Sequence, residues 1–135
     1  MQVGDVLYFG DFVFKDGGHA DKLLVVLAIV DGEALMVIGT SKGKQTNPGC
    51  QPTPKKFFLK AGNTTFPKDT WLDLARTPTV SPVANLEQAI QLGKISLKKT
   101  LSQQLVNEIK NCLKKHAVDS LDKTMCKMLG VTPRW

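Results

Sequence analysis

Cysteine is scarce in this sequence, and the few cysteines form no recognisable pattern. The 135 residues contain three of them, Cys50, Cys112 and Cys126, an odd number without CxxC spacing. Small disulfide-held domains carry paired cysteines, and structural zinc sites usually take ligands from closely spaced pairs. The sequence thus argues against a disulfide framework and a zinc site, and it favours a reducing cytoplasm. We expect no metal and no other cofactor.

Long apolar runs are also lacking. None approaches the ~20 residues that a membrane helix needs, and the first residues lack the basic and apolar stretches of a secretory signal. Neither an internal repeat nor a low-complexity tract is present. The length suits one domain with a core of its own. We expect a soluble, cytoplasmic, single-domain protein that has no membrane partner.

Charge is distributed unevenly along the chain. Residues 1–40 hold six acidic residues and two lysines, a net charge of −4, whereas the remainder holds sixteen basic and six acidic residues, a net charge of +10. A basic region of this size suits a polyanionic partner, but lysines on helices also serve simply to keep a protein soluble. Charge alone does not choose between these readings.

The clearest structural signal is a β-hairpin over residues 22–44. Two apolar runs flank Asp31-Gly32, a pair that tolerates the positive φ angles of a type I′ turn. In an antiparallel pair, the start of one strand lies beside the end of the other. We therefore expect Lys22 to lie near Thr40 and Ser41, at one rim of the sheet.

Turn signals and apolar spacing predict the other elements. Further strands are expected at residues 5–14 (bent at Gly10-Asp11), 55–60 and 70–74, with loops at 15–21, 45–54 and 61–68. Helices are expected at residues 82–92, at 101–115 after a capping box at Thr100, and from Asp119 or Ser120 to Leu129. Strands followed by helices favour a small antiparallel barrel or half-barrel with helices at one end.

Several segments together resemble the MazF/PemK/Kid family of toxin ribonucleases. They are GDVLYFGDFVFKDGG, KLLVVL, the strand that ends in TSKGK, LDLARTPT and LGKISLKKTLSQQLVNEIKNCL, in this order and spacing. The resemblance implies a mainly β fold, an SH3-like antiparallel barrel over residues 1–80 with a helical part over 81–135. It also implies a cytoplasmic homodimer, a toxin of a type II toxin-antitoxin system that cleaves single-stranded RNA without metal and is inhibited by a small acidic antitoxin.

The resemblance also implies site residues. Catalytic roles fall on Lys22, Thr40, Arg76 and His19, and substrate contacts on Ser41, Lys42, Lys44, Asp73 and Thr77. The chain departs from the family pattern at two places. Lys22 stands where the family usually has arginine, and Pro78-Thr79 follows Arg76-Thr77 where some members have an aspartate.

Metal-free RNA cleavage needs a base for the ribose 2′-OH, cations for the developing phosphorane charge and an acid for the departing 5′ oxygen. Arg76 can offer a planar two-pronged donor that Lys22 cannot, and His19 or Asp73 could accept the proton. These residues also have non-catalytic interpretations. Lys22 can be an ordinary lysine at the end of a strand, and Asp73 and Arg76 can form an ordinary ion pair. The alternative function is a catalytically degenerate barrel that binds nucleic acid or protein.

Overall fold

The computed structural model describes residues 1–13, 19–40, 47–51, 55–61 and 69–131, without the side chains of 11–13 and 19–21. It is mainly β. The strands are β1 (Asp5–Val13), β2 (His19–Val30), β3 (Glu33–Thr40), β4 (Gly49–Gln51), β5 (Lys56–Leu59), β6 (Thr70–Asp73), β7 (Thr79–Pro82) and β8 (Ile95–Thr100). The helices are α1 (Val83–Gln91), α2 (Gln103–His116), the 3-10 turn η1 (Val118–Ser120) and α3 (Lys123–Leu129).

All eight strands belong to one antiparallel sheet in the order β4-β5-β6-β3-β2-β1-β8, and β7 pairs with the first half of β3. The hairpin prediction is confirmed, because Asp31 and Gly32 have φ angles of 52° and 77°, as a type I′ turn requires. The predicted bend in β1 is a shift of register between Phe9 and Phe12. Among the described pairings the sheet is open, with β4 and β8 at its two ends.

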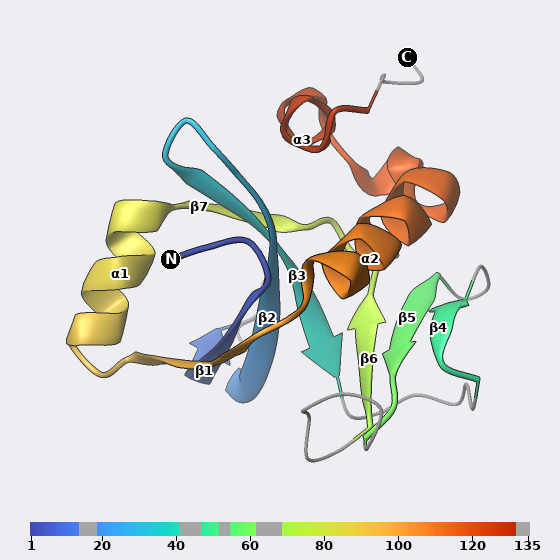
Figure 1. The fold of residues 1–135 in the computed structure, drawn as a ribbon. Helices are drawn as coiled ribbons and strands as arrows, with labels where there is room; N and C mark the ends of the chain where they lie inside the picture. Colours follow the sequence, from blue (N-terminus) through green and yellow to red (C-terminus); the bar gives the residue numbers. More distant parts are fainter. Residues whose placement is uncertain (14–18, 41–46, 52–54, 62–68, 132–135) are drawn as a thin grey trace.

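The two faces of the sheet pack against different helices. On β2, Leu24 and Val26 join a core cluster that includes Leu86 of α1, whereas Val25 and Leu27 join a larger cluster with the buried residues of α2 and α3. Successive side chains of a strand point to opposite faces, which explains this division. We call the two sides the α1 face and the α2 face. Figure 1 shows α1 beside β7, well away from α2, which crosses near β5 and β6.

Several predicted boundaries are wrong. The chain is already in β2 at His19, inside the expected loop over 15–21, and β4 lies within the expected loop over 45–54. Strand β8 follows α1 and pairs with β1, so residues 81–135 are not purely helical. The cap of α2 is Ser102 rather than Thr100: the Ser102 hydroxyl accepts a hydrogen bond from the Leu105 amide at 3.2 Å. Thr100 instead donates its hydroxyl to Asp5 at 2.7 Å.

Lysine crowding on α2 leads to a pH-dependent prediction. Partial burial, and then the charge of Lys114 one turn away, lower the pKa of Lys110 below 10.5. The unfolded chain holds this proton more tightly, so the charged lysine opposes folding at neutral pH, and its penalty fades as pH rises towards 10.5. Lys110→Gln should therefore stabilise the protein at pH 7 and lose that advantage above pH 10.5, as urea unfolding at both pH values would measure. Lys115→Gln, which removes an exposed lysine from the same helix, is the control and should show a smaller gain.

Candidate functional site

Strand pairing brings several predicted site residues into one row on the α1 face. The register of β2 and β3 places Lys22 next to Thr40, the last residue of β3. Thr40 pairs with Trp71 of β6, and Trp71 pairs with Phe58 of β5. Directly paired residues of an antiparallel sheet point to the same side, and Lys22 is two residues from Leu24, which faces α1. All four side chains therefore belong to the α1 face.

Asp73 continues this surface beyond Trp71, two residues further along β6. Its carboxylate oxygens lie 3.8 Å from Nε of Arg76 and 3.9 Å from Nζ of Lys56, which pairs with Asp73 across β5 and β6. The Lys56 and Asp73 side chains are 20% and 21% exposed, and that of Arg76 is 53% exposed. Arg76 is thus the member of this charged trio most open to a ligand. We call Lys56, Asp73 and Arg76 the charged trio.

A local turn explains how Arg76 returns to Asp73. The Asp73 carboxylate accepts a hydrogen bond from the Ala75 amide at 3.2 Å, the side-chain-to-backbone contact by which aspartate commonly starts a turn. The chain bends over residues 74–76 before β7 begins. Thr77 follows on the exposed side of this bend, and Pro78 is buried. The sequence order Asp73, bend, Arg76 therefore creates a close pair of opposite charges at the end of β6.

Sheet geometry gives the spacing between the row and the charged trio. Strands lie about 4.8 Å apart and advance about 3.4 Å per residue, so the Cα atoms of Thr40 and Asp73 are roughly 8 Å apart. An arginine side chain spans most of such a gap. Thr40 and the charged trio are therefore neighbours on this face, with Lys22 on the far side of Thr40. The arrangement combines cations, a hydroxyl and a carboxylate, the group types that phosphate binding and proton transfer use.

The other predicted site residues fall largely outside what the structure describes. His19 opens β2, where its backbone pairs with Val13, and its side chain is not described. Ser41, Lys42 and Lys44 lie in residues 41–46, outside the described part of the chain. The roles of these four residues stay predictions.

The aromatic residues near the row are core residues. Phe58 and Trp71 stack with their ring centroids 4.7 Å apart, and they are 3% and 8% exposed. Burial of this degree removes them as platforms for unpaired bases. Their stacking across β5 and β6 instead fixes the two strands that carry the charged trio.

Lys56 is the site residue that sequence reasoning missed. It begins β5 two residues before Phe58, so the period-2 alternation of a strand places both on the same face. This signal was available in the sequence. Its meaning depended on the pairing of β5 with β6, which supplied Asp73 as the neighbour.

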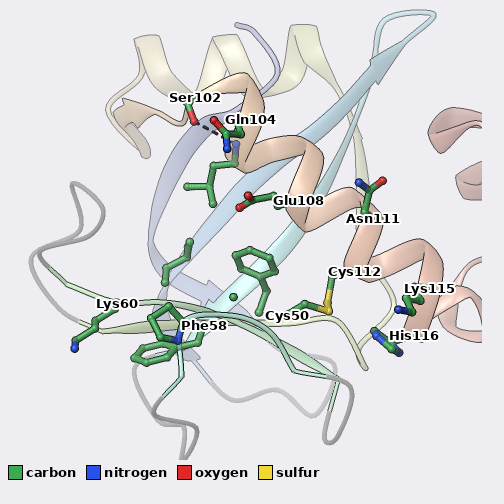
Figure 2. Close-up of a pocket in the computed structure, with 15 residues that line it drawn as sticks. Cys50, Phe58, Lys60, Ser102, Gln104, Glu108, Asn111, Cys112, Lys115 and His116 are labelled. Atoms are coloured by element: carbon green, nitrogen blue, oxygen red, sulfur yellow. Dashed lines mark hydrogen bonds between the residues drawn. A yellow bond between two sulfur atoms is a disulfide. The ribbon is translucent and has the colours of Figure 1, made fainter.

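The α2 face contains a groove between α2 and strands β4 and β5 (Figure 2). Its volume is about 830 Å³. Phe57, Leu59 and Leu105 supply apolar walls, and Glu108 and His116 are among the polar groups along α2. Among the described residues, Lys22, Thr40 and the charged trio do not line this groove. Phe58 of the row does line it, so the two surfaces meet at β5.

A disulfide between Cys50 of β4 and Cys112 of α2 crosses one end of the groove. The prediction that the cysteines form no disulfide is therefore wrong. Cys126, the odd cysteine, is buried with a free thiol. The odd number of cysteines was a poor guide, because one unpaired thiol in the core does not prevent the other two cysteines from forming a disulfide. The cytoplasmic location was inferred from the number and spacing of the cysteines. It stays a prediction, and the cysteines no longer support it.

Reduction of this disulfide should lower stability. The bond closes a loop with a sequence separation of 62 residues, for which loss of chain entropy in the unfolded state gives about 4 kcal/mol, and measured values are commonly 2–4 kcal/mol. Urea unfolding with and without a strong dithiol reductant should show a decrease within that range. Equal midpoints in both buffers, with complete reduction verified by mass, would contradict this prediction.

The described residues contain neither a cluster of metal ligands nor a membrane-spanning helix. No three His, Cys, Asp or Glu side chains in that part of the chain are grouped as a metal site would require. Across the same residues, none of the helices has both the length and the hydropathy of a membrane span.

Comparison of the chain with protein-family models, with curated proteins and with solved structures found no match. The resemblance to the MazF/PemK/Kid family therefore still rests on the sequence segments quoted above, and the site has to be judged on its own geometry.

Proposed function

We propose that this protein is a toxin of the MazF/PemK/Kid type, an endoribonuclease that cleaves single-stranded RNA without a metal ion. The observation that carries the proposal is the convergence on one sheet face of Lys22, Thr40 and the charged trio. These residues come from four strands and from the bend after β6. Helix α1 packs against β7 and β8, and α2 packs against the opposite face, so neither lies over this row.

In the proposed reaction, Arg76 binds two oxygens of the scissile phosphate through its planar guanidinium. The Thr40 hydroxyl holds a third oxygen or orients the ribose 2′-OH, and Lys22 adds positive charge as the phosphorane forms. Asp73 or His19 accepts the 2′-OH proton, and the departing 5′ oxygen takes a proton from that same group or from solvent water as the 2′,3′-cyclic phosphate forms. Asp73, which also contacts Lys56, holds Arg76 in place before substrate arrives, and this reduces the ordering that binding requires.

The remaining features of the proposal follow from the resemblance and from charge. The open sheet of the described residues would correspond to an SH3-like barrel, whose curvature is favoured by the bulges in β1 and β2. A homodimer would present two basic rims. The net charge of +10 beyond residue 40 suits both RNA and a small acidic antitoxin that competes for the same surface.

The alternative is a catalytically degenerate domain of the same fold that binds nucleic acid or protein. Lys22 in place of arginine, and Pro78-Thr79 in place of an acid, favour this alternative. A lysine binds phosphate as a point charge without the two-pronged geometry of arginine. Such a domain would keep the basic surface and lack the cleavage reaction.

One assay separates the two functions. Single-stranded RNA is incubated with the protein in buffer containing a chelator, beside the same strand with 2′-deoxyribose throughout. The nuclease should cut only the RNA and leave a 2′,3′-cyclic phosphate, because the attacking group is the neighbouring 2′-OH. Retardation of both strands without cleavage, weakening steeply with salt, would instead establish the binding domain.

A further inference from the structure

The disulfide differs from a buried structural bridge in its access to solvent. Cys50 is exposed on β4, whereas Cys112 is 3% exposed on α2. Both cysteines line the open groove of about 830 Å³. Of the two residues, Cys50 is therefore the more open to a dissolved thiolate, whereas Cys112 is largely buried.

A lysine and a histidine lie beside Cys112, the buried cysteine of the disulfide. Lys115 and His116 follow Cys112 by three and four residues on α2, so all three share one side of the helix, and all three line the groove. Figure 2 shows Lys115 and His116 next to the disulfide, with Lys60 at the opposite end of the groove. Glu108, one turn before Cys112, is the acidic side chain among the lining residues. The groove therefore favours an anion at its disulfide end.

Apart from the disulfide, strand β4 has few backbone pairings that fix it to the sheet. It has three residues and pairs with β5 alone among the described strands. The Gln51 side-chain amide donates hydrogen bonds to the carbonyls of Asn47 at 2.6 Å and Gly49 at 3.3 Å. Both bonds stay within residues 47–51, so they do not tie β4 to a neighbouring element.

We propose that the Cys50–Cys112 disulfide is an exchange site for small anionic thiols that enter the groove. The incoming thiolate attacks Cys50, forms a mixed disulfide with it, and releases Cys112 as a thiolate beside Lys115 and His116. A second thiolate attacks the outer sulfur of the mixed disulfide and leaves Cys50 as a thiolate. The sum is oxidation of two small thiols to their disulfide and reduction of the protein to a dithiol. This site goes beyond the proposed RNA cleavage and does not depend on it.

The test uses three small thiols that differ in charge: 2-mercaptoethanesulfonate, 2-mercaptoethanol and cysteamine. The oxidised full-length protein is treated with each at low salt, quenched by alkylation, and mapped by peptide mass. The first adduct should lie on Cys50. At equal thiolate concentration the anionic thiol should react several-fold faster than the cationic one, and salt should reduce the difference.

Two variants sharpen the result. Lys115→Gln should reduce the preference for the anionic thiol, whereas Lys94→Gln, an exposed lysine after α1 and outside the groove lining, should preserve it. Cys112→Ser leaves Cys50 as the single groove thiol. Treatment of this variant with the symmetric disulfide of 2-mercaptoethanesulfonate should place one mixed disulfide per chain on Cys50 and release one equivalent of the free thiol. An initial adduct on Cys112, equal rates for the three thiols, or three free thiols in the air-oxidised native protein would each overturn the proposal. Mapping on the wild-type protein decides the site even if Cys112→Ser does not fold.

Discussion

Replacing Arg76 by alanine should abolish measurable cleavage of single-stranded RNA and relieve growth arrest in cells that express the protein. The side chain is half-exposed at the edge of the charged trio, and it is the group there that can bind two phosphate oxygens in one plane. Loss of one such donor commonly lowers a rate by about 10²- to 10³-fold. Initial rates on a fluorescent RNA in chelator-containing buffer would measure the decrease.

Three controls make this test specific. Lys94→Ala removes the same charge from an exposed position after α1 and should leave the rate unchanged. Lys22→Arg restores the residue usual in the resembled family and should preserve or raise the rate. Circular dichroism should show an intact fold for Arg76→Ala, since its contact with Asp73 is partly exposed and worth little in stability. Unchanged cleavage by a folded Arg76→Ala would show that the site assignment is wrong, even if the protein is a ribonuclease.

Replacing Gly4 by alanine should destabilise the protein by at least about 3 kcal/mol. Gly4 has a φ angle of +96°, and a Cβ atom there would lie 2.8 Å from the Leu101 carbonyl oxygen and 3.3 Å from a methyl group of Val106. The Gly4 amide and carbonyl are already bonded to Val26 and Leu101 at 2.8 and 2.9 Å. The backbone at Gly4 therefore cannot rotate or shift to relieve the clash without losing the hydrogen bonds that join the start of β1 to β2 and to the start of α2. Chemical unfolding would measure the loss.

Gly32→Ala is the matched control for this effect. Gly32 also has a positive φ, +77°, but a Cβ there would meet nothing within 4 Å. Its substitution should cost only the conformational strain, about 1–2 kcal/mol. If the two variants lose equal stability, close packing around Gly4 contributes nothing and only its backbone angle matters.

Local signals in the sequence predicted the elements whose physical cause is local. The Asp31-Gly32 turn needs only two residues that tolerate positive φ. The spacing of Leu101, Leu105, Ile109, Cys112 and Leu113 predicted α2 as an amphipathic helix. Ile109, Cys112 and Leu113 are buried in it as expected, and Val106 is buried in place of Leu105. Its first residue was misplaced because Thr100 and Ser102 are both capping types, and Thr100 bonds instead to Asp5, 95 residues away.

Features that depend on distant partners were missed. Strand β8 has one buried residue, Ile95, and its apolar alternation stops after Leu97, where two lysines follow. Its pairing with β1, more than 80 residues away, makes it a strand. The Cys50–Cys112 bond has a sequence separation of 62 residues, and spacing alone cannot reveal such a partner. At the candidate site, the chain order placed Lys22 beside Thr40, whereas the contact of Lys56 with Asp73 required the β5–β6 register.

The late position of β8 has a consequence for synthesis. Strand β1 leaves the ribosome well before its second partner, β8, which spans Ile95–Thr100. The buried carboxylate of Asp5 also accepts a hydrogen bond from Thr100. Pairings between such distant segments form slowly, and an unpaired strand edge invites association with other chains in the meantime. The nascent protein therefore exposes one edge of β1 until β8 has been made. Truncation before residue 95 should yield an aggregation-prone fragment even though the central hairpin is complete.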